Sequence, residues 1–360
     1  MINKELKIEA IELLKNLIKA KSFSTEEDDA AQIIENFLKQ KGVHCYRKGN
    51  NIWAWNRDHR DDTFTILLNS HIDTVRPGPD WKIDPFEPVI IDGKLHGLGS
   101  TDAGGALVAL IATFLHFDHK VDIPFNLIIS ATAEEETSGE NGIASILDDL
   151  GKIDLAIVGE PTNMRLAVAE KGLMVLDCTA QGKSGHVVYD FGENAIETAI
   201  KDINWLHSYK FANESLTLGP IKIKVTMIAA GRQHNIIPDS CKFTVDVRTT
   251  DAYSNEEILK IIEKHITSTI TPRSINLNAS QIAQDHLIVR AARSIGMELF
   301  ISPTTSDQAL IQADSVKIGP GCSEQSHTPD EFIELRAIEQ GIDIYIKLLD
   351  TYAQLLKDQR

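Results

Sequence analysis

The stretch TFTILLNSHID, residues 63–73, combines an apolar run with a polar end. Residues 63–68 are predicted to form a strand, because short apolar runs are typical of strands buried on both faces. His71 and Asp73 follow two residues apart, so their side chains point to the same side of an extended chain. Open α/β sheets bind ligands at the carboxyl ends of their strands, so this stretch indicates both a fold class and a site.

Apolar strands and helices alternate on either side of this stretch. The predicted strands are 52–55, 63–68, 125–131 and 153–158. Helices are predicted over 6–18 and 103–117, with another that has Glu26 and Glu27 in its first turn and apolar residues of 30–38 on one face. Ser24 or Thr25 is the predicted N-cap of the second helix. The alternation predicts a mixed sheet covered by helices on both faces, which is an α/β/α domain.

The pattern changes after residue 172. Strands at 173–180, 221–229 and 242–248, with helices at 194–207 and 255–265, predict an antiparallel sheet with helices on one face. The α/β pattern then returns, with a helix at 285–295, a strand at 316–318 and a helix at 331–356. We therefore predict a catalytic domain of residues 1–172 and 285–360, interrupted by an inserted α+β domain of residues 173–284.

The composition excludes several classes of protein. The 360 residues are 42% hydrophobic and 24% charged, as in ordinary globular proteins, and a net charge of −16 disfavours nucleic acids and anionic membranes as partners. The four cysteines are far apart in the sequence, which is typical of reduced thiols in a cytosolic protein rather than of a disulfide framework. The N-terminal segment does not resemble a signal peptide, and no apolar stretch is expected to approach the roughly 18 residues of a membrane span. We expect a cytoplasmic protein.

Four further polar clusters accompany the His71–Asp73 pair. They contain Asp102 within Gly97–Gly105, the acids Glu134–Glu136, Glu160 after the strand 153–158, and His327 within Ser326–Glu331. Each has an ordinary alternative: Asp102 also suits a helix N-cap, and three adjacent acids also suit a solvated loop. Together, two histidines and several carboxylates are better explained by one metal site that suits zinc, cobalt or manganese.

Taken in order, these clusters resemble the co-catalytic zinc aminoacylases and exopeptidases that include acetylornithine deacetylase, succinyl-diaminopimelate desuccinylase and carboxypeptidase G. The resemblance implies two divalent metal ions, zinc in the first instance. His71 and Glu160 would bind one ion, Glu136 and His327 the other, and Asp102 would bridge them. Asp73 would orient His71, and Glu135 would be the general base. A shift of one residue within Glu134–Glu136 would exchange the base and ligand roles, and the spacing leaves this open.

The resemblance also implies a homodimer. His186, in Gly182–His186, would be a hydrogen-bond donor that the inserted dimerisation domain supplies to the partner's site; without the resemblance it suits a surface histidine. Arg248 would bind the substrate carboxylate, although a strand-edge ion pair is an equal alternative. The complete set of expected substrate contacts is Asn235, Arg248, Thr305, Lys171 and Arg76.

The implied activity is hydrolysis of the amide bond of a small N-acyl amino acid, N-acetyl- or N-succinyl-ornithine or -citrulline, in arginine biosynthesis. The chain looks closest to a short acetylornithine deacetylase-like branch of Bacteroidetes type. It departs from the family pattern after Asp102, where Ala103-Gly104-Gly105 replaces the Met-Lys-Gly that most relatives carry. Two alternatives remain: a succinyl-diaminopimelate desuccinylase or dipeptidase on the same scaffold, and a non-catalytic protein that binds amino-acid derivatives.

Overall fold

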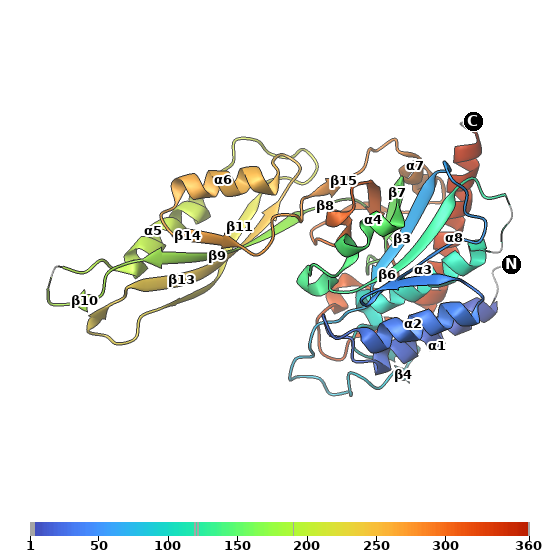
Figure 1. The fold of residues 1–360 in the computed structure, drawn as a ribbon, viewed down its shortest axis with the longest axis horizontal. Coiled ribbons are helices and arrows are strands. Elements are labelled where there is room, and N and C mark those ends of the chain that lie inside the picture. Colours follow the sequence, from blue (N-terminus) through green and yellow to red (C-terminus); the bar gives the residue numbers. More distant parts are fainter. Residues whose placement is uncertain (1–3, 119, 121, 190, 359–360) are drawn as a thin grey trace. The chain divides into compact units, whose positions relative to one another are not determined.

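A computed structural model describes residues 4–118, 120, 122–189 and 191–358, which form two compact units (Figure 1). The first comprises Met1–Val168, Gln281–Phe300 and Ser306–Arg360, and the second Ala169–Ser280 with Ile301–Thr305. The last of these segments differs from our domain prediction, which placed it in the catalytic domain. It lies with the second unit because the Ser302 carbonyl accepts the Lys171 N–H and Thr305 Oγ1 donates to the Lys171 carbonyl (2.8 Å).

The first unit is built on a nine-stranded mixed sheet with the order β1-β2-β6-β3-β7-β17-β8-β15, in which β16 also pairs with β8. The strands are β1 (Cys45–Lys48), β2 (Asn51–Trp55), β3 (Thr65–His71), β6 (Asn126–Thr132), β7 (Leu155–Val158), β8 (Leu166–Glu170), β15 (Ser280–Gln281), β16 (Leu299–Ser302) and β17 (Asp314–Lys317). The four central strands β6, β3, β7 and β17 run parallel. Their carboxyl ends therefore meet at one edge of the sheet.

Both faces of this sheet are buried, as the apolar strands predict. In β3, Ile66 and Leu68 pack into the larger core, whereas Leu67, between them, packs into a smaller core on the other face. The larger core is closed by α1 (Lys4–Lys19), α2 (Asp28–Gln40), α3 (Gly105–Asp118), α7 (Leu287–Ser294) and α8 (Leu335–Asp358). The smaller core is closed by η3 (Ile143–Ser145), α4 (Leu147–Leu150) and η4 (Asp307–Leu310). The predicted α/β fold class is confirmed.

The predicted cap of the second helix was wrong. Helix α2 begins at Asp28 with Glu27 in the N-cap position, and no side chain caps it. The Ser24 hydroxyl donates instead to the Asp73 carboxylate (2.7 Å), and Thr25 adopts a left-handed φ of 75°. Ser24 is thus engaged by the polar end of β3 rather than by the helix that follows it.

The predicted C-terminal helix begins four residues too early. Residues Phe332–Glu334 form strand β18, which pairs antiparallel with β5 (Lys94–His96), and β5 pairs with β4 (Val89–Ile91). Helix α8 therefore starts only at Leu335. This small sheet joins segments that are more than 200 residues apart, so local periodicity could not reveal it.

The expectation that no apolar stretch approaches the length of a membrane span also requires correction. The stretch Ser100–Asp118 is long and apolar enough, but 83% of it is buried inside the protein. Helix α3 packs between the sheet and α8, so its hydrophobicity is that of a core helix.

The second unit has a four-stranded antiparallel sheet of order β11-β13-β9-β14. Its strands are β9 (Gly172–Gln181), β11 (Lys222–Ala230), β13 (Ser240–Thr249) and β14 (Thr269–Pro272). Helices α5 (Ala195–Ser208) and α6 (Asn255–His265) contribute to its single core, as predicted for an α+β unit. A two-stranded sheet joins β10 (Gly185–His186) to β12 (Ile236–Ile237).

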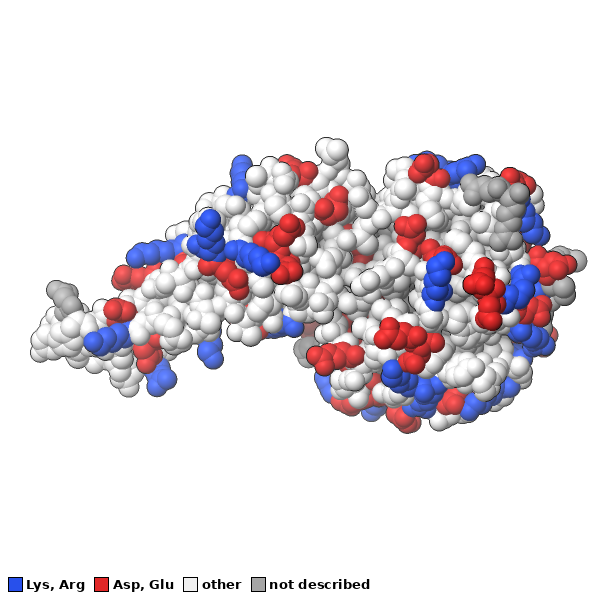
Figure 2. All heavy atoms as spheres, turned by 45° about the horizontal axis from the view of Figure 1, so that its top comes forward, with Lys and Arg blue, Asp and Glu red and all other residues white. Residues whose placement is uncertain are grey.

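Charged side chains of both signs are interspersed over the face shown in Figure 2. On that face, Lys and Arg do not merge into a continuous basic surface.

Candidate metal centre

The carboxyl ends of three adjacent parallel strands carry most of the predicted ligands. His71 is the last residue of β3 and is only 2% exposed. Glu135 and Glu136 lie in the short helix η2 (Glu135–Thr137) that follows β6, and Glu160 comes two residues after β7. Because β6, β3 and β7 are neighbours in the sheet, these side chains from distant parts of the sequence share one edge.

Asp102 lies between the two predicted metal-binding histidines. Its Oδ1 is 3.2 Å from His71 Nε2, and its Oδ2 is 3.7 Å from His327 Nε2. The two oxygens of one carboxylate thus face two different imidazoles. Asp102 belongs to the irregular segment η1 (Ser100–Gly104), where its φ of −112° and ψ of 99° are not helical. Its side chain therefore faces the histidines instead of capping α3.

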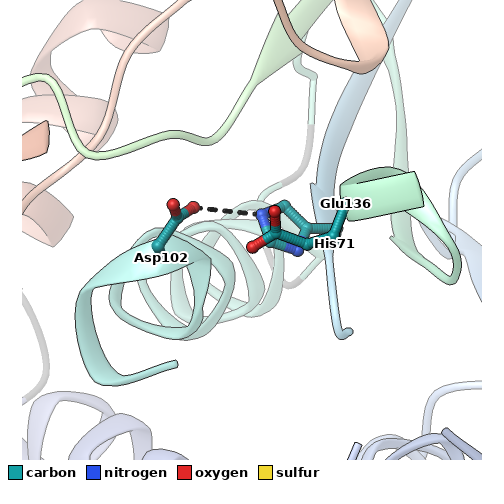
Figure 3. A group of neighbouring side chains, drawn as sticks. All are labelled: His71, Asp102 and Glu136. Carbon is teal, nitrogen blue, oxygen red and sulfur yellow. Dashed lines mark hydrogen bonds and ion pairs between the residues drawn. The ribbon is translucent and has the colours of Figure 1, made fainter. Parts of the chain in front are cut away.

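Each histidine is accompanied by a second carboxylate. Glu160 Oε1 is 3.8 Å from His71 Nε2, and both carboxylate oxygens of Glu136 are 3.0 Å from His327 Nε2. One ligand atom from each of His71, Asp102 and Glu136 lies within 4.8 Å of the others. Figure 3 shows these three side chains converging from β3, η1 and η2. The structure therefore brings together all five predicted metal ligands.

Asp73 connects His71 to the acidic turn. The Asp73 backbone carbonyl is 3.0 Å from His71 Nδ1, and Asp73 Oδ1 is 3.5 Å from the same nitrogen. When the proton is on Nδ1, the lone pair of Nε2 is free and is directed at Asp102. The buried Asp73 carboxylate also accepts the backbone N–H groups of Glu135 (3.0 Å) and Glu136 (3.1 Å). Asp73 thus holds the acidic turn as well as the imidazole.

The three adjacent acids have different surroundings. The Glu134 carboxylate accepts hydrogen bonds from the backbone N–H (3.1 Å) and side-chain amide (2.9 Å) of Asn141. Glu136 faces His327, as described above. The charges of His71, Glu160, Asp307 and Glu136 all act on Glu135. This arrangement agrees with the register in which Glu134 is structural and the next two acids belong to the site.

The electrostatics of the cluster suit a cation. Burial, with the charge of Asp102, raises the pKa of Glu160 to about 8, and burial raises the pKa of Glu135 well above its usual range. The hydrogen bond with Glu136 raises the pKa of His327 to about 9. So many acids close together are unfavourable unless protons or metal ions neutralise them. Two imidazoles and three carboxylates are a donor set that zinc, cobalt and manganese accept.

Two buried acids of this region were not predicted as site residues. Asp307 accepts hydrogen bonds from Asn69 (2.8 Å) and Thr132 (2.9 Å) beneath the cluster, and burial raises its pKa to about 6. Glu331 accepts backbone N–H groups from the segment that carries Asp102. Asp307 lies two residues after the expected substrate contact Thr305, and Glu331 ends the polar cluster Ser326–Glu331. Only tertiary contacts distinguish them from their neighbours.

Gly99 is required by the backbone of the Asp102 segment. Its φ of 73° is left-handed, and an added Cβ would lie 2.5 Å from Thr74 Cγ2. A larger residue there would be strained by the left-handed φ and would have to displace the Thr74 side chain. The glycines noted in the sequence therefore shape the loop that places Asp102 beside His71.

The predicted substrate contacts are engaged within their own units. Arg76 pairs with Glu26 and lies over the ring of Phe23, 4.3 Å from its centroid. Arg248 makes a two-pronged ion pair with Asp246 (2.9 and 3.0 Å), which is the strand ion pair considered as its alternative. Neither guanidinium has a hydrogen bond to the metal-ligand cluster among the contacts of the described residues.

The remaining predicted contacts belong to the second unit. Lys171 Nζ donates to the Pro220 carbonyl (2.9 Å), and the Lys171 carbonyl accepts the Thr305 hydroxyl. The Asn235 carbonyl accepts the Val187 N–H beside β10. His186 is exposed, and its Nδ1 accepts the backbone N–H of Val188 (3.3 Å). His186 therefore carries its proton on Nε2, which is available to donate.

Comparison with known proteins identifies relatives over nearly the whole chain. The family model described as Peptidase family M20/M25/M40 matches residues 67–351. A succinyl-diaminopimelate desuccinylase of Wolbachia pipientis subsp. Culex pipiens is 27% identical, covering 96% of this chain and 94% of its own. Nothing in the comparisons supports the predicted Bacteroidetes-type branch or a place in arginine biosynthesis.

Solved structures share the fold at low sequence identity. An M20 family metallo-carboxypeptidase from Sulfolobus solfataricus superposes with a TM-score of 0.80 at 16% identity, covering 96% of this chain and 99% of that one. A dinuclear metal-binding peptidase of the M20 family from Bacillus subtilis gives a TM-score of 0.73 at 16% identity, covering 99% of each chain. These similarities extend over both units.

Proposed function

Because the chain belongs to peptidase family M20/M25/M40 and is a metal-dependent amidohydrolase, we propose that it hydrolyses the amide bond of an N-acyl amino acid at a two-metal centre. The observation that carries this proposal is the position of Asp102, whose two carboxylate oxygens face two histidines. Each histidine has its own glutamate, Glu160 or Glu136. His71 and Glu160 would hold one ion, Glu136 and His327 the other, and Asp102 would contact both.

Glu135 is the proposed general base. When bound, two divalent ions would polarise the scissile carbonyl, lower the pKa of a water molecule and offset the repulsion among the acids. Glu135 accepts a proton from that water as it attacks the amide carbon, and passes the proton to the departing amine. The Asp73 carboxylate accepts the backbone N–H of Glu135 and so holds Glu135 in place. The amide C–N bond breaks, leaving a carboxylate and a free amine.

His186 is the proposed donor to the oxyanion formed during attack. The proton on its Nε2 provides one hydrogen bond, and such donors stabilise the transition state in acyl transfer. We propose that His186 acts on the site of a partner subunit in a homodimer. The open edge strand β11 supports a dimer, because Met227 and Ile228 on it are 64% and 58% exposed. Edge strands with exposed apolar side chains are ready to pair with another chain.

The substrate proposal starts from the relatives. The desuccinylase that covers 96% of this chain is named for succinyl-diaminopimelate, so N-succinyl-diaminopimelate is the first substrate to test. A succinyl group exceeds an acetyl group by a methylene and a carboxylate, and a pocket that pairs a polar group rejects an analogue lacking that group far more strongly than one lacking a methylene. Acetyl and succinyl substrates must therefore be compared directly.

The proposed function is tested by a hydrolysis panel. The purified protein is loaded with zinc, cobalt or manganese and assayed for amine release from succinyl-diaminopimelate, succinylornithine, succinylcitrulline, acetylornithine and acetylcitrulline. We expect the highest kcat/KM with succinyl-diaminopimelate and no turnover after exhaustive chelation. Preference for another member would overturn the substrate assignment alone. Absence of turnover on every member with all three metals would overturn the proposed hydrolysis.

Metal binding is expected to stabilise the first unit. A ligand present at about 100 times its Kd adds about 2.7 kcal/mol to the free energy of unfolding. For a domain of this size, 1 kcal/mol raises Tm by about 2–4 °C. Adding zinc to chelator-treated protein should therefore raise its Tm by roughly 5–10 °C in calorimetry. Asp102→Ala, which removes the carboxylate between the histidines, should show little of this increase. An equal increase in the variant would contradict the bridging position of Asp102.

A further inference from the structure

Glu331 lies in a buried position between two ligand-bearing segments. It follows His327 by four residues and immediately precedes β18. Its side chain is almost fully buried, being 2% exposed. Burial of a carboxylate is unfavourable unless hydrogen-bond donors surround it. Among the described residues, the hydrogen-bond donors to the Glu331 carboxylate all come from the segment that carries Asp102.

Three backbone N–H groups of that segment converge on the Glu331 carboxylate. Oε1 accepts the N–H of Thr101 (2.7 Å) and of Asp102 (3.1 Å), and Oε2 accepts the N–H of Gly99 (3.0 Å). The backbone of Glu331 adds a fourth connection, because its carbonyl accepts the Gly97 N–H (3.0 Å). Glu331 thus satisfies N–H groups that an irregular segment would otherwise leave buried without acceptors.

The conformation of Asp102 makes these bonds important for the site. Asp102 has extended rather than helical dihedral angles, so the hydrogen bonds of α3 do not hold it in place. Its backbone N–H is bound by Glu331, while its carboxylate faces His71 and His327. We infer that Glu331 is a positioning residue, which ties the Asp102 segment to the His327 segment so that one carboxylate lies between the two histidines.

This inference rests on the proposed two-metal centre and adds a residue that does not itself contact a metal or substrate. Glu331→Ala removes both carboxylate oxygens, which together accept three backbone N–H groups. Glu331→Gln keeps the shape of the side chain but replaces one oxygen with an NH₂ group that cannot accept a hydrogen bond. Asp330→Ala is the matched control. The Asp330 carboxylate accepts the N–H groups of Lys82 and Ile83 (2.9 Å each), in a segment without proposed ligands.

The test measures metal affinity by titration, the visible absorption of the cobalt-loaded protein, kcat and KM, and unfolding in urea. Loss of residues that orient metal ligands weakens metal affinity or activity by about 10–100-fold. We expect Glu331→Ala to lower affinity for the more weakly bound metal equivalent by such a factor. We also expect kcat to fall more than KM changes, and the cobalt spectrum to shift. Glu331→Gln should lie between Glu331→Ala and the wild type, and Asp330→Ala should match the wild type in metal affinity, cobalt spectrum and kcat.

Two results would overturn the inference. One is wild-type metal affinity, cobalt spectrum and kcat in a folded Glu331→Ala. The other is an equal loss in Asp330→Ala, which would indicate general destabilisation of this region. If Glu331→Ala does not fold, the metal affinity and cobalt spectrum of Glu331→Gln decide, with unchanged values counting against the inference. If the wild-type protein itself binds no metal, the proposed function fails before this question arises.

Discussion

Replacing Glu135 with Gln is expected to lower kcat by roughly 10²–10⁴-fold, the usual contribution of a general base. The side-chain amide has almost the same shape as the carboxylate but cannot accept a proton from water. The backbone N–H of residue 135 still donates to Asp73, so the acidic turn keeps its support. Metal affinity, fold and KM should therefore change little while turnover is lost.

The matched control for this experiment is Glu134→Gln. Its carboxylate accepts two hydrogen bonds from Asn141 and faces neither histidine of the cluster within hydrogen-bond distance. The substitution should lower the free energy of unfolding by about 1 kcal/mol, the net value of one hydrogen bond, with kcat changed only slightly. Initial rates under saturating substrate, metal analysis and urea unfolding measure the three quantities. The opposite pattern, with turnover lost in Glu134→Gln and kept in Glu135→Gln, would show that the base is one residue earlier.

The sheet and its site-bearing edge were predictable because hydrophobic periodicity is a local property. The buried strands ending at His71 and before Glu135 are short apolar runs, and the polar residues after them need no knowledge of tertiary structure. The antiparallel strands β9 and β13 were equally clear, since their burial alternates residue by residue.

What sequence could not reveal depends on contacts between distant segments. Ser24 resembled a helix cap, but the structure gives its hydroxyl to Asp73, 49 residues away. Residues 332–334 have the character of a helix start, yet pairing with β5 makes them a strand. In the sequence, Glu331 is one acid among several, and the three N–H groups that its carboxylate accepts belong to residues 229 to 232 positions away. Local pattern cannot encode such partners.

The order of roles within Glu134–Glu136 illustrates the same limit. The three side chains are chemically identical, so spacing alone left a shift of one residue open. The backbone separates them: Glu134 has a left-handed φ of 57° and turns to Asn141, whereas Glu136 faces His327. A bend in the chain at the end of β6 therefore gives neighbouring identical residues different environments.

Two inactive variants are expected to restore activity when they share a dimer. His186→Ala removes the proposed oxyanion donor and should lower kcat by about 10²–10³-fold. Glu135→Gln removes the base. If His186 acts on the partner's site, a mixed dimer has one site with both residues intact and one site with neither. Mixed dimers, prepared by co-expression with two different affinity tags, should therefore reach about half the wild-type turnover per dimer, because a symmetric dimer has two equivalent sites.

The mixed dimer of Glu135→Gln with Glu135→Ala is the control, because neither of its sites has a base and no arrangement of subunits can supply one. Sedimentation analysis of the same samples determines whether the chains are dimeric. Dimers in which the His186→Ala and Glu135→Gln chains stay inactive would show that His186 acts within its own subunit or not at all. Monomers would show that the exposed edge of β11, with Met227 and Ile228, does not pair two copies. Restored turnover requires that the two chains form a dimer and that the second unit of each chain contributes His186 to the site of the other chain. Only such a dimer can form one complete site from two incomplete chains.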